Sequence, residues 1–319
     1  MGDNDYDIEQ EDDITVPTII MLVILVAEDF VGMWINSFIV AINCFERIKH
    51  RGLYSSDNIL TVVAFSRFCV LLKTTLQTFC SIFYLEIYYM DTVFQAFRAV
   101  TWFLNSSNQW FAACLGVFYC VKIANFSHPL FISLKFRISR LVPWLLLVSV
   151  LFSLFSSLPF LNTPYKIRYN NFNSSLRGVY YTVKNVTVET SVSHVLFICG
   201  TGFSAAFTIF IISAFLLLFS LWRHTRRMQN NSSCFRSPCV EAHIQAMKAI
   251  MSFFLINVVN FIALLILLTN TLEETSLMGI ACTIIIDACP SVHSIVLILS
   301  NPKLKTTLIK VLHYAKCKG

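Results

Sequence analysis

The sequence predicts an all-α membrane protein, a seven-transmembrane helix bundle with a short amphipathic C-terminal helix. Of its 319 residues, 56% are hydrophobic and only 13% are charged, whereas about 25% of a soluble domain is charged. Seven runs reach the length of about 20 apolar residues that a helix needs to cross a bilayer core of about 30 Å. They cover residues 16–44, 58–83, 94–121, 141–160, 191–222, 246–269 and 276–300.

Basic residues follow the first, third, fifth and seventh runs, and short cytoplasmic loops retain Lys and Arg. The clearest groups are Arg47, Lys49 and Arg51; Lys135, Arg137 and Arg140; Arg223, Arg226, Arg227 and Arg236; and Lys303, Lys305, Lys310, Lys316 and Lys318. We therefore expect a multi-pass protein of the plasma membrane with its amino terminus extracellular and its carboxyl terminus cytoplasmic.

Three parts are expected along the chain. Residues 1–15 form an acidic extracellular segment, unlike the basic start of a cleavable signal peptide. Residues 16–300 form the helix bundle. Residues 301–319 form a cytoplasmic amphipathic helix and tail, in which leucines recur at helical spacing opposite lysines, a pattern typical of a helix lying on the lipid bilayer.

Two glycosylation sequons lie in the loop between the fourth and fifth predicted spans. Asn173 is followed by Ser-Ser and Asn185 by Val-Thr. Because the basic loops place this segment outside, we expect both asparagines to carry glycans.

The motifs of common enzymes do not occur in the sequence. HExxH, a P-loop, GxSxG and paired Cys-x-x-Cys are all missing. Most of the 11 cysteines fall inside apolar runs or basic loops, which is typical of small core residues rather than of a disulfide framework. We expect no enzymatic activity, no cofactor, no metal and no nucleic-acid partner.

An arginine lies inside the second predicted span. Arg67 is about two to three helical turns from the cytoplasmic side, too deep for its head to reach water. A buried charge of this kind needs partners on neighbouring helices, and Asn36 and the region of Ser294 are the expected acceptors. The resulting network either locks the bundle or breaks and reforms on activation, and both interpretations stay open.

A polar face is expected on the third predicted helix. Trp102, Asn105, Ser106 and Gln109 recur about one turn apart and so share one side of its outer half. A ring with amide donors and acceptors suits a pocket for small, partly apolar molecules. The alternative is that these residues are hydrogen-bond contacts between helices.

Several motifs together resemble one receptor family. The residues that carry the resemblance are Glu28, Gly32, Asn36, Phe38 and Ile39; Ile59-Leu60-Thr61 and Ser66-Arg67; the run from Trp110 through Phe118-Tyr119 and Lys122 to Ser127-His128-Pro129; Phe219 to His224; Glu241, His243 and Lys248; and Pro290 to Ser294 before Asn301. From about residue 20 onward the chain is similar to the type 2 (bitter) taste receptors, a family of G-protein-coupled receptors.

This resemblance implies a receptor that binds bitter small-molecule agonists between the outer halves of its helices and activates a gustducin-like heterotrimeric G protein at the cytoplasmic face. The ligand residues it implies are Thr101, Trp102, Asn105, Ser106, Gln109, Asn260, Thr283 and Asp287. The activation network and G-protein side are implied at Asn36, Arg67, Phe118, Tyr119, Lys122, His243, Lys248, His293 and Ser294.

The chain departs from the family pattern in the ligand region. The family's pocket tryptophan aligns with Thr101, and Trp102 is one position further on. Ser106 stands where histidine is frequent, and Asn260 where tyrosine is common. The agonists of relatives are therefore not carried over to this chain.

Two other functions fit part of the sequence: a transporter or channel, and a receptor for another ligand class. Charges inside the spans are also found in transporters and channels, but here they form no rings and the sequence shows no half-symmetry. A rhodopsin-like receptor for another ligand class would carry an Asp/Glu-Arg-Tyr triplet after the third span, where this chain has Phe118-Tyr119 and Lys122.

Overall fold

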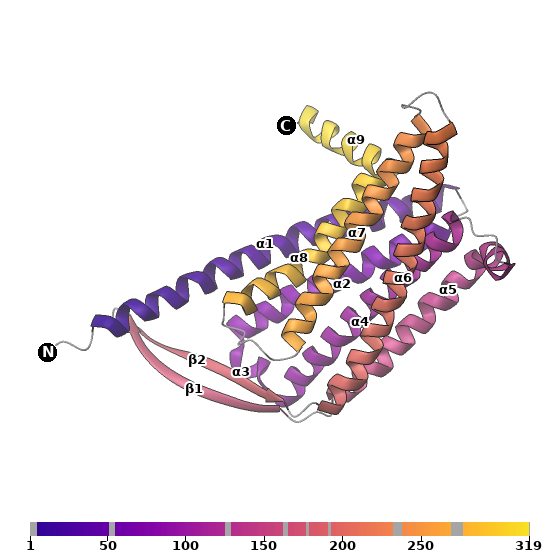
Figure 1. The fold of residues 1–319 in the computed structure, drawn as a ribbon. Coiled ribbons are helices and arrows are strands. Elements are labelled where there is room, and N and C mark those ends of the chain that lie inside the picture. Colours follow the sequence, from indigo (N-terminus) through magenta and orange to yellow (C-terminus); the bar gives the residue numbers. More distant parts are fainter. Residues whose placement is uncertain are drawn as a thin grey trace.

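The computed structural model describes residues 5–50, 55–124, 129–161, 165–176, 179–190, 193–231, 238–268 and 277–318. Within these ranges seven long helices form the bundle in Figure 1: α1 (Asp5–His50), α2 (Ser55–Phe83), α4 (Asp91–Ile123), α5 (Pro129–Ser157), α6 (Ser193–Asn231), α7 (Pro238–Leu268) and α8 (Leu277–Ser300). Two short elements lie between these helices, α3 (Leu85–Tyr88) and the 3-10 turn η1 (Leu158–Leu161), and helix α9 (Pro302–Lys318) follows α8.

The helical membrane bundle expected from the sequence is confirmed. In the described part of the chain, 6 helices are long and apolar enough to cross a membrane: α1, α2, α5, α6, α7 and α8. The chain is thus a multi-pass membrane protein. Helix α4 is of similar length, with 33 residues, but the polar run from Asn105 to Gln109 lowers its hydropathy.

The helices extend past the runs that hydropathy marks. Helix α5 begins at Pro129, whereas the apolar run begins at 141, because Lys135, Arg137 and Arg140 continue the helix beyond the apolar segment. Proline is favoured in the first helical turn, where its missing N–H costs no hydrogen bond. Hydropathy therefore locates the part of a helix in the membrane, not its ends.

A β-hairpin connects α5 and α6, a feature that the sequence analysis did not predict. Strand β1 (Tyr165–Leu176) pairs antiparallel with β2 (Val179–Thr190), with Tyr165 opposite Thr190 and Leu176 opposite Val179. β-branched residues recur along β2, as is usual in strands. Figure 1 shows the hairpin at the same end of the bundle as the amino terminus.

Six helices form a closed ring by their contacts, in the order α1, α2, α4, α6, α7 and α8, and α5 packs on α4 outside this ring. The largest core cluster lies where α2, α4 and α5 meet, and it is built around Ile59, Val63, Phe118 and Ile138. Many large apolar side chains face outward, for example Trp144 at 67% and Phe155 at 73% exposure. Such a surface suits lipid rather than water.

Helix α1 approaches α2 and α8 closely at Gly32. A Cβ atom placed there would lie 2.7 Å from Cδ1 of Leu71 in α2 and 3.1 Å from Cβ of Ser291 in α8. Real Cβ atoms essentially never come within 3.0 Å of another non-bonded heavy atom, so a larger residue fits here only if the side chains of Leu71 and Ser291 move. Small residues allow helices in lipid to pack at short range.

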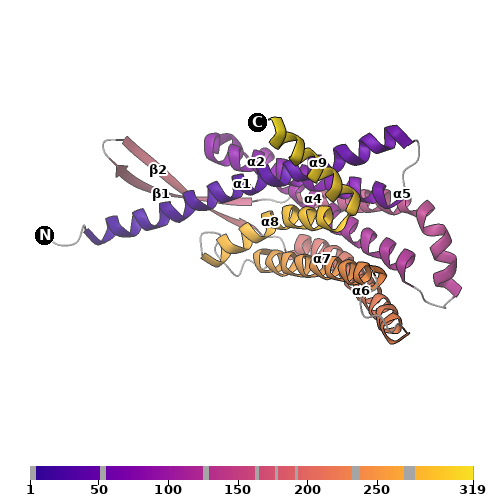
Figure 2. The ribbon, with the colours of Figure 1, turned by 90° about the horizontal axis from the view of Figure 1, so that it is seen from above.

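Helix α9 turns away from α8 and lies across the bundle end, as Figures 1 and 2 show. Leu304 is completely buried beside Ile39 and Ile298, while Lys305 and Lys310 are exposed. The expected amphipathic C-terminal helix is therefore confirmed. Lys303 of α9 forms ion pairs with Glu46 of α1 and with Asp57 of α2, and in the second pair Nζ lies 3.3 Å from Oδ2.

Candidate functional site

A hydrogen-bonded chain links α2, α8 and α1 in the middle of the bundle. Arg67 donates from Nη1 to Oγ of Ser294 over 3.2 Å, and the Ser294 hydroxyl lies 2.7 Å from Oδ1 of Asn36. Asn36 and Ser294 are 0% exposed and Arg67 is 3% exposed. The structure thus brings together the three residues that the sequence analysis joined, with Ser294 between the other two.

Asn36 and Ser294 also form hydrogen bonds within their own helices. Asn36 donates from Nδ2 to the carbonyl oxygen of Gly32 over 2.8 Å, and the Ser294 hydroxyl lies 2.9 Å from the carbonyl oxygen of Pro290. The single hydroxyl proton of Ser294 therefore has two acceptors, Asn36 and Pro290. Such a donor can exchange partners at little cost, which is what a rearranging network requires.

His293 lies next to this chain and connects α8 to α7. Its ring centroid is 3.8 Å from that of Phe253, and the side chain is 4% exposed. Nδ1 of His293 and Nε of Arg67 have no hydrogen-bond partner among the described residues. Buried polar atoms without partners cost free energy, so this arrangement is not the best possible one for either side chain.

A second group of ionisable residues lies further out between α1, α2 and α8. Asp29 is 1% exposed, and its Oδ2 accepts a hydrogen bond of 2.9 Å from Thr75 Oγ1 in α2. Lys73 interacts electrostatically with Asp287, Arg98 and Asp29. Asp287 therefore belongs to the part of α8 that faces α1 and α2.

The residues of the polar face expected on α4 lie in different environments in the structure. Trp102 packs against Phe160 of η1 and Phe203 of α6, with ring centroids 5.4 Å and 6.1 Å away. Thr101 bonds within its own helix, donating from Oγ1 to the carbonyl oxygen of Phe97 over 2.6 Å. Asn105 is half-buried.

The remaining polar atoms of this region lack partners. Within the described structure, no hydrogen bond reaches Nε1 of Trp102, Nε2 of Gln109 or Oδ1 of Asn260. Ser107 and Asn108, which were not among the expected ligand residues, also have buried oxygen atoms without partners among the described residues. The signal that could have found them is their place in the same polar run. Buried polar groups are usually hydrogen-bonded in a native state, so these atoms are exceptions that need an explanation.

Two further residues expected to bind the ligand are Ser106 and Thr283. Ser106 is buried at 3% exposure. Thr283 donates from Oγ1 to the carbonyl oxygen of Gly279 over 3.1 Å within α8.

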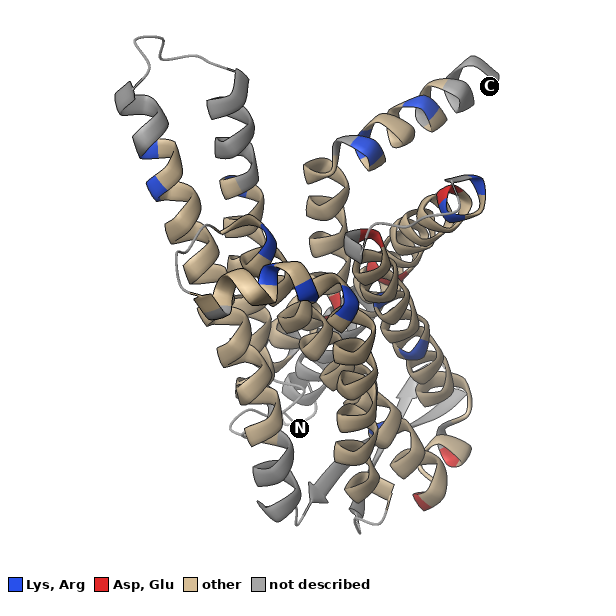
Figure 3. Cartoon of the chain, turned by 90° about the vertical axis from the view of Figure 1, so that its right-hand side faces the viewer, with Lys and Arg blue, Asp and Glu red and all other residues tan. Residues whose placement is uncertain are grey.

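At the inner end of α4, Phe118 is 1% exposed and packs edge-on against Tyr119 at 5.8 Å. Nζ of Lys122 lies 5.2 Å from the centroid of the Phe118 ring, and Lys248 is exposed on α7. Figure 3 shows basic residues gathered toward this end of the bundle.

Three candidates have side chains outside the described residues. His243 lies on α7, Asn173 on β1 opposite Thr182, and Asn185 on β2 opposite Asn170. Among the described residues, no three His, Cys, Asp or Glu side chains are grouped so as to hold a metal ion.

Comparison with known proteins agrees with this geometry. The family model described as taste receptor protein (TAS2R) matches residues 14–316. Taste receptor type 2 member 40 of Gallus gallus is 39% identical over 293 residues, which cover 92% of this chain and 94% of that protein. Taste receptor type 2 member 39 of Mus musculus is 35% identical over 296 residues, 92% of each chain, and that of Homo sapiens is 37% identical over 286 residues, 90% of this chain and 84% of that one.

These relatives are receptors and not enzymes, and as a family they bind ligands and couple to G proteins. A match over nearly the whole chain, with Arg67, Ser294 and Asn36 joined at the centre of a helical membrane bundle, leads to one conclusion: this chain belongs to the type 2 taste receptor family of G-protein-coupled receptors.

Proposed function

We propose that this chain is a plasma-membrane receptor that detects bitter small molecules outside the cell and activates a gustducin-like heterotrimeric G protein inside. All seven long helices, α4 included, cross the bilayer. Residues 1–15 are extracellular and residues 301–319 are cytoplasmic. The basic residues at the α9 end of the bundle support this orientation, because Lys and Arg are retained on the cytoplasmic side.

The agonist binds between the outer halves of α4, α6, α7 and α8. The observation that carries this placement is the set of buried polar atoms without partners at Trp102, Gln109 and Asn260, next to the aromatic rings of Phe160 and Phe203. Apolar walls with a few convergent polar groups are the usual composition of a small-molecule site.

Signalling follows if the agonist binds one arrangement of the helices better than another, since a ligand with equal affinity for both shifts nothing. The chain Arg67–Ser294–Asn36 is the element that rearranges, because Ser294 has two acceptors for one proton. Phe118, Tyr119, Lys122, His243 and Lys248 lie on the side that meets the G protein.

The test is calcium release in cells that express the receptor with a chimeric gustducin-type G-protein subunit, challenged with a panel of bitter compounds. Receptor-dependent, saturable responses to some members of the panel are expected. Surface-expressed receptor that stays silent to the whole panel with several G-protein chimeras, yet responds to a peptide or transports a solute, would contradict the proposal.

A further inference from the structure

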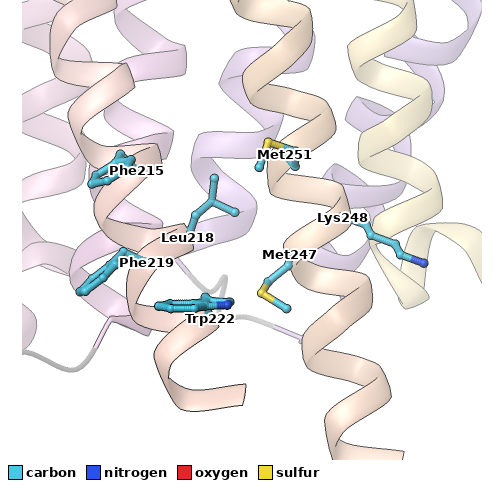
Figure 4. A pocket seen from close by; sticks show the side chains of 7 residues that line it. All are labelled: Phe215, Leu218, Phe219, Trp222, Met247, Lys248 and Met251. Carbon is cyan, nitrogen blue, oxygen red and sulfur yellow. The ribbon is translucent and has the colours of Figure 1, made fainter. Parts of the chain in front are cut away.

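An apolar groove runs between the inner ends of α6 and α7. It has a volume of about 490 Å³ and is lined by Phe215, Leu218, Phe219 and Trp222 of α6 and by Met247, Lys248 and Met251 of α7. Figure 4 shows the two methionines directed toward α6, and the Lys248 ammonium directed away from the other side chains. Only the stem of Lys248 contributes to the wall.

This groove faces the lipid and not the bundle interior. Leu217 and Leu221, next to the groove residues on α6, are 2% and 5% exposed, and Leu217 packs against Cys120 of α4. By contrast, Phe215 and Trp222 are 65% and 51% exposed. At 100° per residue, the groove residues lie on the side of α6 turned away from α4.

Two rows of side chains on α6 lead from the groove to the inner membrane surface. Residues four apart lie above one another on a helix, so Phe215, Phe219 and Arg223 form one row, and Leu218, Trp222 and Arg226 form the other. Each row is apolar along the groove and ends in an exposed arginine.

The charge at the end of the groove is wholly positive on α6. Between Ser193 and Asn231 the helix contains no Asp or Glu. The guanidinium carbon of Arg226 lies 5.5 Å from the centroid of the Trp222 ring. A guanidinium held by its face on a ring keeps its edge donors free, and these donors match a phosphate.

We propose that this groove binds one anionic phospholipid of the inner leaflet, with an acyl chain between α6 and α7 and the phosphate-bearing head group on Arg223 and Arg226. The groove volume lies within the range of about 300–1,000 Å³ that small-molecule sites have. The groove is apolar along its length and ends in two cationic side chains. This sequence matches the acyl chain and the anionic head group of one phospholipid, whereas a sterol has no anionic head group.

The experiment uses the full chain in vesicles and reads the fluorescence of Trp222. Brominated acyl chains quench a tryptophan that they touch. Quenching is measured in phosphatidylcholine vesicles that contain increasing fractions of brominated phosphatidylserine or of brominated phosphatidylcholine. Subtraction of the Trp222→Phe variant isolates the signal of Trp222 from that of the other tryptophans.

In the wild type, Trp222 should be half-quenched at a much lower fraction of phosphatidylserine than of phosphatidylcholine. Arg223→Gln with Arg226→Gln should remove this preference, with about a fivefold loss of affinity for each arginine. Arg226→Lys keeps the positive charge but loses the paired N–H donors of the guanidinium. Its preference for phosphatidylserine should therefore be smaller than that of the wild type and larger than that of the double variant.

The matched control is Arg137→Gln with Arg140→Gln, two exposed arginines at the same spacing near the inner end of α5. This variant should keep the preference. Equal quenching by both lipids in the wild type, or an equal loss in the α5 control, would overturn the proposal. Quenching that disappears only at high receptor density would do the same, since it would place a second copy of the chain in the groove.

Discussion

Arg67 and Ser294 join α2 to α8 by a single hydrogen bond of 3.2 Å, and this bond is the longest in the chain that continues to Asn36. Because the Ser294 hydroxyl can bond either to Asn36 or to Pro290, substitutions of Ser294 and Arg67 test most directly whether this chain takes part in signalling.

Ser294→Ala should change signalling more than binding. The substitution removes both the acceptor of Arg67 and the donor to Asn36, and a lost hydrogen bond to a charged group costs about 1.5–3 kcal/mol. We expect altered basal or maximal calcium responses per surface receptor, with little change in directly measured agonist occupancy. Arg67→Ala should act in the same direction.

The control for this variant is Ser300→Ala in the same helix, where the exposed hydroxyl bonds only to the carbonyl oxygen of Val296. If Ser294→Ala and Arg67→Ala reach the surface and signal with the wild-type basal level, maximum and potency, the chain is a scaffold and not a switch.

Asn105→Ala should weaken the response to agonists. The loss of a buried hydrogen-bond partner costs about 1–3 kcal/mol, or roughly a fivefold to 150-fold rise in the half-maximal concentration. Thr208→Ala in α6 is the control, because that exposed hydroxyl bonds to the carbonyl oxygen of Ser204 within its own helix. Unchanged potency of Asn105→Ala across chemically distinct agonists would show that Asn105 only connects helices.

Glycosidase digestion tests the orientation. The expressed protein should lose mass on digestion, and Asn173→Gln combined with Asn185→Gln should abolish that loss. Both positions lie on the β-hairpin at the amino-terminal end of the bundle. A full mass shift in the double variant would place the hairpin on the cytoplasmic side.

Lys303→Gln should loosen α9 slightly. Burial alone would lower the pKa of Lys303, but the hydrogen bonds and charges of Glu46 and Asp57 outweigh burial, and the net pKa is raised above the ordinary 10.5. The Lys303 side chain is 33% exposed, so the ion pair contributes less than about 1 kcal/mol.

Because the folded-state pKa is raised, this stabilisation is complete below the ordinary lysine pKa and is lost as the pH rises through the folded value. The difference in Tm between wild type and variant in detergent should therefore be constant from about pH 6 to about pH 9 and shrink above about 10.5. High salt should reduce it at every pH. A difference that grows with pH would contradict this account.

The sequence predicted the parts of the fold that hydrophobicity alone decides. Six of the seven predicted spans correspond to helices that are long and apolar enough to cross a membrane. Ser294 was expected as an acceptor for Arg67, because an arginine in lipid must find one, whereas Asn36 bonds to Ser294 and not to Arg67 directly. The hairpin was missed because a search for long apolar runs does not detect short strands that mix polar and apolar residues. The ion pair between Lys303 and Asp57 was missed because both side chains are partly exposed, and a charge that water can solvate does not need a partner in the protein.

The candidate site was predictable only in outline. Helical spacing placed Trp102 and Asn105 on one face, but side-chain direction depends on neighbours, and the ring of Trp102 fills space beside Phe160 and Phe203. The groove between α6 and α7 gave no sign in the sequence, since Phe215 and Met251 differ in no way from other apolar residues that face lipid.

The fit of Gly32 against Leu71 and Ser291 has a consequence for natural variants at this position. Every amino acid that can replace glycine adds at least a Cβ atom, so every missense variant at this codon forces Leu71, Ser291 or α1 itself to move. Such a variant should reduce the amount of folded protein and so weaken the response to all agonists together, whereas a change at Asn105 should alter the response to some agonists and leave others unchanged.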